Sequence, residues 1–184
     1  MYPCNPVALT ATIYTLAIEL ADMDRGVYET LDLKVAQHPS ETDEALLARV
    51  LAYCAEYAEG IGFSKGISTP DEPAVFVRDL TGRLRTWIDV GAPDAARIHR
   101  ASKAADRVAV YTHKDPKQML ANWVGERIHK AEAIDIYSFD AAFMAALVAR
   151  LDRRMSFSLS ITDGHLYAAF ADATIDGPIT RHHL

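Results

Sequence analysis

The chain has 184 residues and carries a net charge of −6, and half of its residues are hydrophobic. This composition is typical of one globular domain and excludes a disordered chain, a collagen and a coiled coil. No apolar run is long enough to span a membrane, and residues 1–7 have neither the basic nor the apolar segment of a signal peptide. We therefore expect a soluble, cytoplasmic monomer with no membrane partner.

The charge is unevenly distributed along the chain. Residues 1–77 hold four basic and twelve acidic side chains, whereas residues 78–184 hold fifteen and thirteen. Within residues 78–107 there are seven basic and four acidic side chains. The net negative charge argues against general binding to DNA, but one face of the protein can still be basic.

The first half of the chain predicts a hairpin, a helix and three short strands. Alternating apolar residues indicate strands over 9–20 and 28–36. A helix is expected over 41–59, with Ser40 as its N-cap and acidic residues in its first turn. Short strands follow over 63–67, 74–79 and 84–90, and a turn at 81–82 joins the last two.

The second half continues with alternating helices and strands. Asp94 opens a helix that reaches about residue 106, and helices are also expected over 116–128 and 140–151. Strands are expected over 108–112, 133–138, 155–161 and 166–171, with Asp163-Gly164 as a hairpin turn. The order of helix, three strands, helix and strand predicts an α/β or α+β domain, a mixed sheet flanked by helices.

Charged residues that suit phosphate chemistry gather between positions 38 and 103. Acidic residues on the two arms of a hairpin can bind Mg²⁺ or Mn²⁺ through their oxygens. A basic group nearby can stabilise a scissile phosphate. The candidates are Asp71 and Glu72 before the second strand, Asp89 in the third strand, and Arg97, Arg100 and Lys103 in the following helix.

The register of the hairpin can be predicted from its turn. A two-residue turn at 81–82 makes paired residue numbers sum to 163. Glu72 then lies opposite Gly91 and diagonal to Asp89 on the same face, at roughly 7–8 Å between backbones. Asp71 would point to the other face. This register favours Glu72 over Asp71 as the partner of Asp89, and a slip of one residue would reverse the preference.

Several motifs, in order, resemble the YaeQ family of bacterial proteins over nearly all of the chain from Ala8 onward. They are Ala8-Leu9-Thr10-Ala11-Thr12-Ile13-Tyr14, His38-Pro39-Ser40-Glu41-Thr42, Asp71-Glu72-Pro73, Trp87-Ile88-Asp89-Val90-Gly91-Ala92-Pro93-Asp94 and Arg97-Ile98-His99-Arg100-Ala101. The resemblance implies one compact domain over residues 8–184, preceded by a poorly ordered extension over 1–7.

The resemblance also implies a variant of the PD-(D/E)xK nuclease core. In that class an Asp on one strand and an Asp or Glu on the next hold Mg²⁺, and a Lys two residues further on assists the attacking water. Pro70-Asp71 matches the first element and Asp89 the second. The third element is absent, because position 91 is glycine and lies on the same face as residue 89.

Related nucleases sometimes carry the missing basic group on the following helix. The family likeness puts Arg100 first among the candidates, with Arg97 and Lys103 as alternatives. Arginine does not act as a base at neutral pH, so its role would be to bind phosphate. Glu41 resembles the additional helical acid of some of these nucleases, and Glu44 is its alternative.

Two functions are consistent with these residues. The first is a Mg²⁺-dependent nuclease that hydrolyses DNA or RNA, in which Asp89 binds the metal with Asp71 or Glu72, and Glu41 completes the site. The second is a catalytically inactive nuclease fold that serves as a binding module or a transcription-related regulator, with nucleic acid or protein as its partner. A carboxylate in an apolar strand is costly unless it is paired, so Asp89 can also form an ion pair with an arginine of the next helix.

Overall fold

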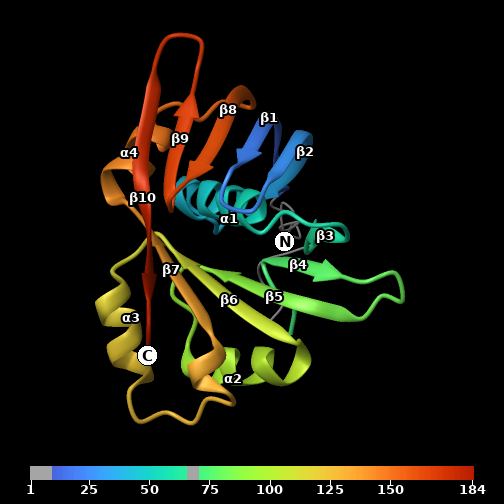
Figure 1. Ribbon diagram of the computed structural model, residues 1–184, viewed down its shortest axis with the longest axis vertical. Coiled ribbons are helices and arrows are strands. Elements are labelled where there is room, and N and C mark those ends of the chain that lie inside the picture. Colours follow the sequence, from blue (N-terminus) through green and yellow to red (C-terminus); the bar gives the residue numbers. More distant parts are fainter. Residues whose placement is uncertain (1–9, 66–70) are drawn as a thin grey trace, which may run out of the picture.

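The computed structural model describes residues 10–65 and 71–184 (Figure 1). The predicted extension over 1–7 and the Pro70 of the nuclease motif lie outside these residues. The strands are β1 (Thr12–Asp22), β2 (Val27–Gln37), β3 (Ile61–Phe63), β4 (Val75–Arg78), β5 (Leu84–Val90), β6 (Arg107–Thr112), β7 (Asp135–Phe139), β8 (Arg154–Thr162), β9 (His165–Ala169) and β10 (Thr174–His182). The helices are α1 (Asp43–Ala55), α2 (Ala95–Ala104), α3 (Pro116–Trp123) and α4 (Ala141–Val148), and a short 3-10 helix covers Ala131–Ala133.

The strands form one mixed sheet in the order β2-β1-β8-β9-β10-β7-β6-β5-β4-β3. Strand β10 joins its two parts, because residues 174–178 pair with β9 and residues 179–182 pair with β7. We call β2, β1, β8, β9 and the start of β10 the first half-sheet, and the remaining strands the second half-sheet. Figure 1 shows α1 between the two halves and α2 on the opposite side of the second half. The fold is therefore a mixed α+β arrangement, as predicted.

Helix α1 is the centre of the larger hydrophobic core. Every residue from Leu46 to Cys54 is buried, as expected for a helix that packs on all sides. Leu47 packs in the same cluster as Leu16 of the first half-sheet and Ile88 of the second. Full burial of a side chain of this size contributes about 1.5–3 kcal/mol. The helix thus holds the two half-sheets together. None of the helices in the described residues is both long and apolar enough to cross a membrane.

A second core lies between the second half-sheet and α2 and α3. Because side chains alternate along a strand, Ile88 faces α1 whereas Trp87 packs with Ile98 of α2. Asp89 has the same parity as Trp87, so its carboxylate is directed to the side of the sheet that α2 covers. This alternation places Asp89 beside the first turn of α2.

The predicted register of the β4–β5 hairpin is confirmed where the strands pair. Val75, Phe76 and Val77 lie opposite Ile88, Trp87 and Thr86, so their numbers sum to 163. The turn is longer than predicted, and the pairing is irregular at Arg78. The paired residues begin at Val75, so Glu72 lies before the strand. The predicted cross-strand pair of Glu72 with Gly91 therefore does not form.

Other boundaries also differ from the prediction. The N-cap of α1 is Thr42, whose side chain accepts a hydrogen bond from the Ala45 amide, and not Ser40. The Ser40 hydroxyl instead lies 2.7 Å from the Nδ1 atom of His38. Helices α1, α3 and α4 are shorter than predicted, and β3 begins two residues before the predicted strand. Asp94 is the N-cap of α2, as predicted.

Candidate functional site

A pocket of about 400 Å³ opens at the end of β5. Four segments line it: the start of α1 with the loop before it, the residues before β4, the segment from Asp89 to Arg97, and His113 with Lys114 after β6. Strands β5 and β6 are parallel neighbours, so both end at this edge of the sheet. Open α/β sheets bind their ligands at such an edge, beyond the carboxyl ends of parallel strands.

The pocket brings together four of the seven predicted site residues. These are Glu41, Glu72, Asp89 and Arg97. Asp71 is exposed in the loop beside Glu72, and its charge contributes to raising the pKa of Arg97. Arg100 and Lys103 are exposed on α2 and do not line the pocket. The basic residue of α2 that reaches the pocket is therefore Arg97, and not the Arg100 that the family likeness favoured.

Asp89 and Arg97 form a two-pronged ion pair. The Nε and Nη2 atoms of Arg97 each donate to one carboxylate oxygen of Asp89 at 2.7 Å. Nη2 also donates to the backbone carbonyl of Glu72 at 2.7 Å, and the guanidinium lies 5.5 Å from the ring centroid of Trp87. The Asp89 side chain is 2% exposed and that of Arg97 is 21% exposed. Burial lowers the pKa of Arg97, but the hydrogen bonds and charge of Asp89 outweigh burial and raise it overall.

Glu41 and Arg49 form a second pair on the α1 side of the pocket. Nε and Nη2 of Arg49 donate to the two carboxylate oxygens of Glu41, each at 2.9 Å. Arg49 also donates to the carbonyl of Ala36 at 2.8 Å and lies over the ring of Phe63. The Glu41 side chain is 2% exposed and that of Arg49 is 5% exposed. This pair is closed off from solvent.

The carboxylates in this arrangement do not fit a divalent cation. Mg²⁺ and Mn²⁺ need several oxygen ligands, and both oxygens of Asp89 and of Glu41 already accept hydrogen bonds from arginine. The carboxylates of Asp71 and Glu72 belong to exposed residues. Across residues 10–65 and 71–184, no cluster of three or more His, Cys, Asp or Glu side chains is placed to hold a metal ion.

The backbone explains why position 91 is not a lysine. Gly91 has a φ of +92°, in the left-handed region that residues with a side chain rarely adopt. A Cβ atom there would meet only the Cε1 atom of His113, at 3.8 Å, so backbone conformation is the obstacle and not space. The Gly91 amide donates to the carbonyl of Tyr111 at 2.9 Å, which holds the chain in this conformation. A lysine at this position would strain the end of β5.

His113 and Lys114 line the pocket but were not among the predicted site residues. Lys114 is exposed, and its ammonium has no ion-pair partner among the described residues. Burial lowers the pKa of His113, the charge of Lys114 lowers it further, and Glu44 opposes both. These residues directly follow β6, the parallel neighbour of β5, so their position in the sequence was a usable signal.

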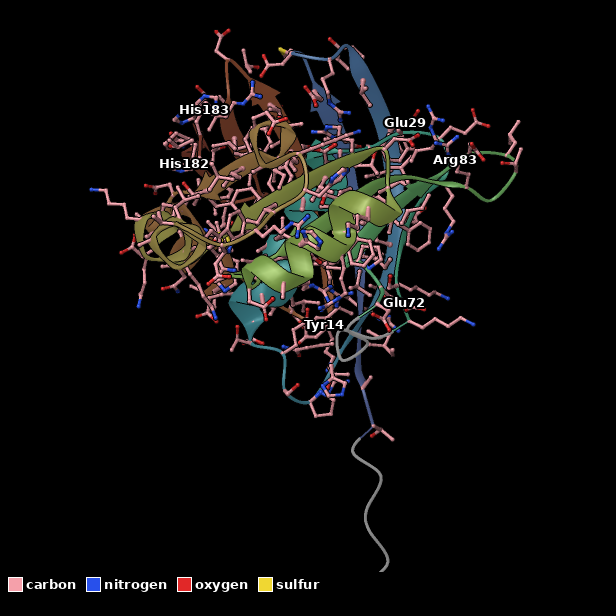
Figure 2. The ribbon with its side chains drawn as sticks, turned by 90° about the horizontal axis from the view of Figure 1, so that it is seen from below. Tyr14, Glu29, Glu72, Arg83, His182 and His183 are labelled. Carbon is pink, nitrogen blue, oxygen red and sulfur yellow. The ribbon has the colours of Figure 1, made fainter. Side chains whose placement is uncertain are left out.

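The pocket therefore presents cations to solvent while its most buried acids are neutralised. Arg97 is partly exposed and Lys114 is exposed, whereas Asp89 and Glu41 are each paired with an arginine. Such an arrangement suits an anion, and the planar guanidinium matches the oxygens of phosphate. His182 and His183 lie far from Glu72 in Figure 2, so they are separate from this pocket.

Comparisons with known proteins place the chain among uncharacterised relatives. Residues 7–177 match the family model described as YaeQ protein. "Uncharacterized protein YaeQ" of Salmonella typhi is 30% identical over 177 residues, which is 95% of this chain and 97% of the relative. "Uncharacterized protein YaeQ" of Escherichia coli (strain K12) is 31% identical over 164 residues, which is 88% of this chain and 90% of the relative.

Two solved structures share the fold. The crystal structure of the YaeQ protein from Xanthomonas axonopodis pv. citri has a TM-score of 0.84 and 31% identity, and the match covers 95% of this chain and 99% of that one. The crystal structure of the YaeQ protein from Pseudomonas syringae also has a TM-score of 0.84, with 27% identity over 93% of this chain and 95% of that one.

Proposed function

The chain belongs to the YaeQ family, and we propose that it is a nucleic-acid-binding module that contacts backbone phosphate through Arg97 and Lys114. The observation that carries this proposal is the two-pronged pair of Asp89 with Arg97. An acid at the end of β5 would serve a nuclease by holding a metal, but here both of its oxygens hold a guanidinium. The pair turns a potential metal ligand into a support for a phosphate-binding arginine.

We also propose that the core of the domain is a variant of the PD-(D/E)xK nuclease fold. The order α1-β3-β4-β5-α2-β6 supports this relation, since it matches the order expected for that core. Under this proposal Asp89 near the end of β5 takes the second acidic position, and Asp71 or Glu72, both before β4, takes the first. Under this proposal the domain keeps the place of the nuclease site but not the free carboxylates.

The arrangement lowers the entropic cost of binding. A free arginine loses up to about 2 kcal/mol of side-chain entropy when a ligand orders it. Asp89, the Glu72 carbonyl and the Trp87 ring already hold the Arg97 guanidinium in one place. Lys114 also lines the pocket and supplies a second charge. A phosphate that contacts both therefore meets the outer side of one positioned guanidinium, whose Nε and Nη2 atoms stay with Asp89, and one flexible point charge.

A second candidate function is metal-dependent hydrolysis of nucleic acid. The observation in its favour is that Glu41, Glu72 and Asp89 come from three separate segments yet line one pocket with Lys114. This function requires Asp89 to give up its hydrogen bonds to Arg97, so we rank it second. Mg²⁺ or Mn²⁺ remains a prediction under this candidate.

Fluorescence anisotropy with a short fluorescein-labelled DNA duplex tests the proposed function. Lys114→Ala should weaken binding several-fold and reduce the slope of log affinity against log salt by about 0.9, the value for one lost phosphate contact. Lys117→Ala is the matched control, because Lys117 is also exposed but does not line the pocket. Equal losses in the two variants, or no binding of the duplex by the native protein, would overturn the proposal.

The same samples separate the two candidate functions. Incubation of the labelled duplex with the protein and Mn²⁺ should leave the duplex intact. Shorter products that appear with the native protein and vanish with Asp89→Asn would favour hydrolysis. Circular dichroism checks that each variant is folded.

A further inference from the structure

We propose that the ligand is a nucleic-acid duplex that extends from the pocket along the exposed face of α2 to the tip of the β4–β5 hairpin, where Leu80 enters its minor groove. This inference rests on the proposed function and names its substrate class. It uses residues outside the pocket, so it can fail while the pocket function stands.

Helix α2 runs back along β5 and connects the pocket with the hairpin. At the pocket end, Arg97 in the first turn of α2 pairs with Asp89 near the end of β5. At the other end, Asp106 just after α2 pairs with Arg83 at 2.5 Å and with Arg85 at 3.0 Å, at the start of β5. The ten residues of α2 span about 15 Å. This length corresponds to about four base pairs of duplex at ~3.4 Å each.

The outer face of α2 carries two cations that are open to solvent. Arg100 and Lys103 are exposed, whereas Ile98 and Ala101 on the opposite face are fully buried. Neither Arg100 nor Lys103 has an ion-pair partner among residues 10–65 and 71–184. A row of exposed cations with this spacing can follow a phosphate backbone.

The charged residues along this route leave a balance of one positive charge. The basic ones are Arg78, Arg83, Arg85, Arg97, Arg100, Lys103 and Lys114, and the acidic ones are Asp71, Glu72, Asp79, Asp89, Asp94 and Asp106. Asp94 accepts a hydrogen bond from the α2 amide of Arg97 as its N-cap, and Asp89 is buried under Arg97. Asp106 is one carboxylate shared by two arginines. Basic side chains continue beside the route around His99. Burial is the main cause that lowers the pKa of His99, and the nearby charges of Lys103, Arg127 and His129 lower it further. The opposite sign of residues 1–77 favours approach of a polyanion from the α2 side.

The tip of the hairpin presents Leu80 in a well-ordered turn. The Asp79 carboxylate accepts hydrogen bonds from the amide and hydroxyl of Thr81 at 2.9 and 2.6 Å and from the amide of Arg83 at 3.1 Å. Leu80 is 95% exposed, the most exposed large apolar side chain of the described residues. The hairpin projects from the body of the protein in Figure 1, and Arg83 lies well apart from Glu72 in Figure 2.

An apolar tip among arginines is suited to the minor groove. Minor-groove proteins insert Leu, Ile, Phe, Met or Pro between base pairs and place arginines beside the wedge. Arg78, Arg83 and Arg85 are exposed residues that flank Leu80 on the two strands. The rigid turn keeps Leu80 directed outward before binding, so little ordering is required on contact.

The position of the exposed aromatic residues favours a duplex over a single strand. Single strands bind mainly by stacking bases on aromatic side chains. The large exposed aromatic residues among those described are Tyr28 and Tyr167, and both lie on the first half-sheet. The α2 route thus presents exposed cations but none of these exposed aromatic side chains. This arrangement favours contact with the phosphate backbone of a duplex.

Anisotropy with a labelled duplex and with each of its separate strands tests the route. The native protein should bind the duplex at least about tenfold more tightly than either strand. Replacing Arg100→Ala together with Lys103→Ala should lower the salt slope for the duplex by about 1.8, for two lost phosphate contacts. Lys34→Ala is the matched control, because Lys34 is exposed on β2 of the first half-sheet. It should leave the slope unchanged.

The wedge is tested by the bend that it causes. Energy transfer between dyes on the two duplex ends should report a bend of about 20–90° when the native protein binds. Leu80→Ser should abolish the bend, and Leu80→Met should restore it, since methionine is also a wedge residue. A bend that persists in Leu80→Ser would overturn the role of Leu80.

The outcomes separate this inference from the pocket function. If Lys114→Ala weakens duplex binding but the Arg100 and Lys103 pair of substitutions does not, the pocket function stands and the route is wrong. If single strands bind as tightly as the duplex, the substrate class is wrong. If the native protein binds neither, both proposals fail.

Discussion

Two arginine–carboxylate pairs face one pocket from opposite sides, and they are built alike. In each pair the Nε and Nη2 atoms of an arginine hold both oxygens of an acid, at 2.9 Å for Arg49 with Glu41 and at 2.7 Å for Arg97 with Asp89. Each arginine also donates to one backbone carbonyl and lies over one aromatic ring. The chemistry of the two pairs is therefore the same.

Their surroundings differ. Arg49 belongs to the buried helix α1, and its side chain is 5% exposed. Arg97 belongs to α2 at the surface, and its side chain is 21% exposed. An enclosed pair serves to hold the loop before α1 in place, whereas a partly open pair can present its arginine to a ligand. Under the proposed function, burial decides which of the two similar pairs binds a ligand.

The largest expected effect is on stability, from removing the enclosed arginine. Arg49→Met leaves the Glu41 carboxylate buried without its partner and should lower the free energy of unfolding by about 3–5 kcal/mol. Arg97→Met should cost less, about 1–2 kcal/mol, because water from the pocket can reach Asp89 once Arg97 is gone. Urea unfolding followed by circular dichroism measures both. An equal or larger loss in Arg97→Met would break the comparison.

Removing both partners of the enclosed pair should cost less than removing one. Glu41→Leu combined with Arg49→Met leaves no unpaired charge, and apolar replacements of buried pairs are often nearly neutral. We expect the double variant to be more stable than Arg49→Met alone by about 1–3 kcal/mol. Urea unfolding of the two single variants and the double variant gives the coupling energy directly. A double variant less stable than Arg49→Met would contradict this account of the pair.

The backbone conformation of Gly91 offers a test that concerns only the partly open pair of Asp89 with Arg97. Gly91→Ala should destabilise the protein by about 1–2 kcal/mol, because a residue with a Cβ atom is strained at a φ of +92°. Gly26→Ala is the matched control, since Gly26 also has a positive φ, of +68°, and open space around it, but lies in the turn between β1 and β2 and lines neither the pocket nor the α2 route. Thermal unfolding should show similar losses in both, while duplex binding should change only in Gly91→Ala. Loss of binding in Gly26→Ala alone would count against the pocket.

The smallest expected effect concerns pH. Burial, with the charge of Lys114, lowers the pKa of His113 in the folded protein, whereas the unfolded chain titrates near the ordinary value of about 6.5. The unfolded state then binds more protons between these two values, so stability is lost as the pH falls through this interval. His113→Gln should remove this loss. The unfolding free energy of the native protein minus that of the variant should fall as the pH is lowered from neutral. A rise in this difference would contradict the predicted direction.

The features predicted well from the sequence are those that depend on neighbouring residues. Asp94 was recognised as a helix start because its side chain and the apolar spacing after it are local signals. The β4–β5 register followed from the turn near 81–82, and it holds although the turn itself is longer. The order of elements in the core could be predicted for the same reason.

The features that were not predicted depend on contacts distant in sequence. Strand β10 contains Gly177 and Pro178, which usually argue against a strand, but here the chain passes from one half-sheet to the other at this point. A Cβ at Gly177 would lie 2.5 Å from the Cβ of Phe143, so α4 packs too closely for any other residue. Such a close approach is set by the folded arrangement and leaves no pattern along the strand.

The acids of the site and Arg97 were predicted, whereas Arg49 and Lys114 were not. Glu41 and Asp89, which the family likeness implied, line one pocket with Glu72, which the hairpin register favoured over Asp71. Arg49 was overlooked, although a lone arginine in the apolar stretch of α1 was a signal for a buried partner. Lys114 was not predicted, because the family likeness places the missing basic group on the helix after β5, and Lys114 instead follows β6. The metal role of the acids and the catalytic role of the basic residues stay predictions.

Titration calorimetry with Mn²⁺ tests most directly whether Asp89 serves Arg97 or a metal. The account predicts that the native protein binds no Mn²⁺ through Asp89 at millimolar concentration, because Arg97 holds both oxygens. Arg97→Ala should create a Mn²⁺ site, and adding Asp89→Asn to that variant should remove it. Stoichiometric Mn²⁺ binding by the native protein that disappears in Asp89→Asn would contradict the account and make Asp89 a metal ligand.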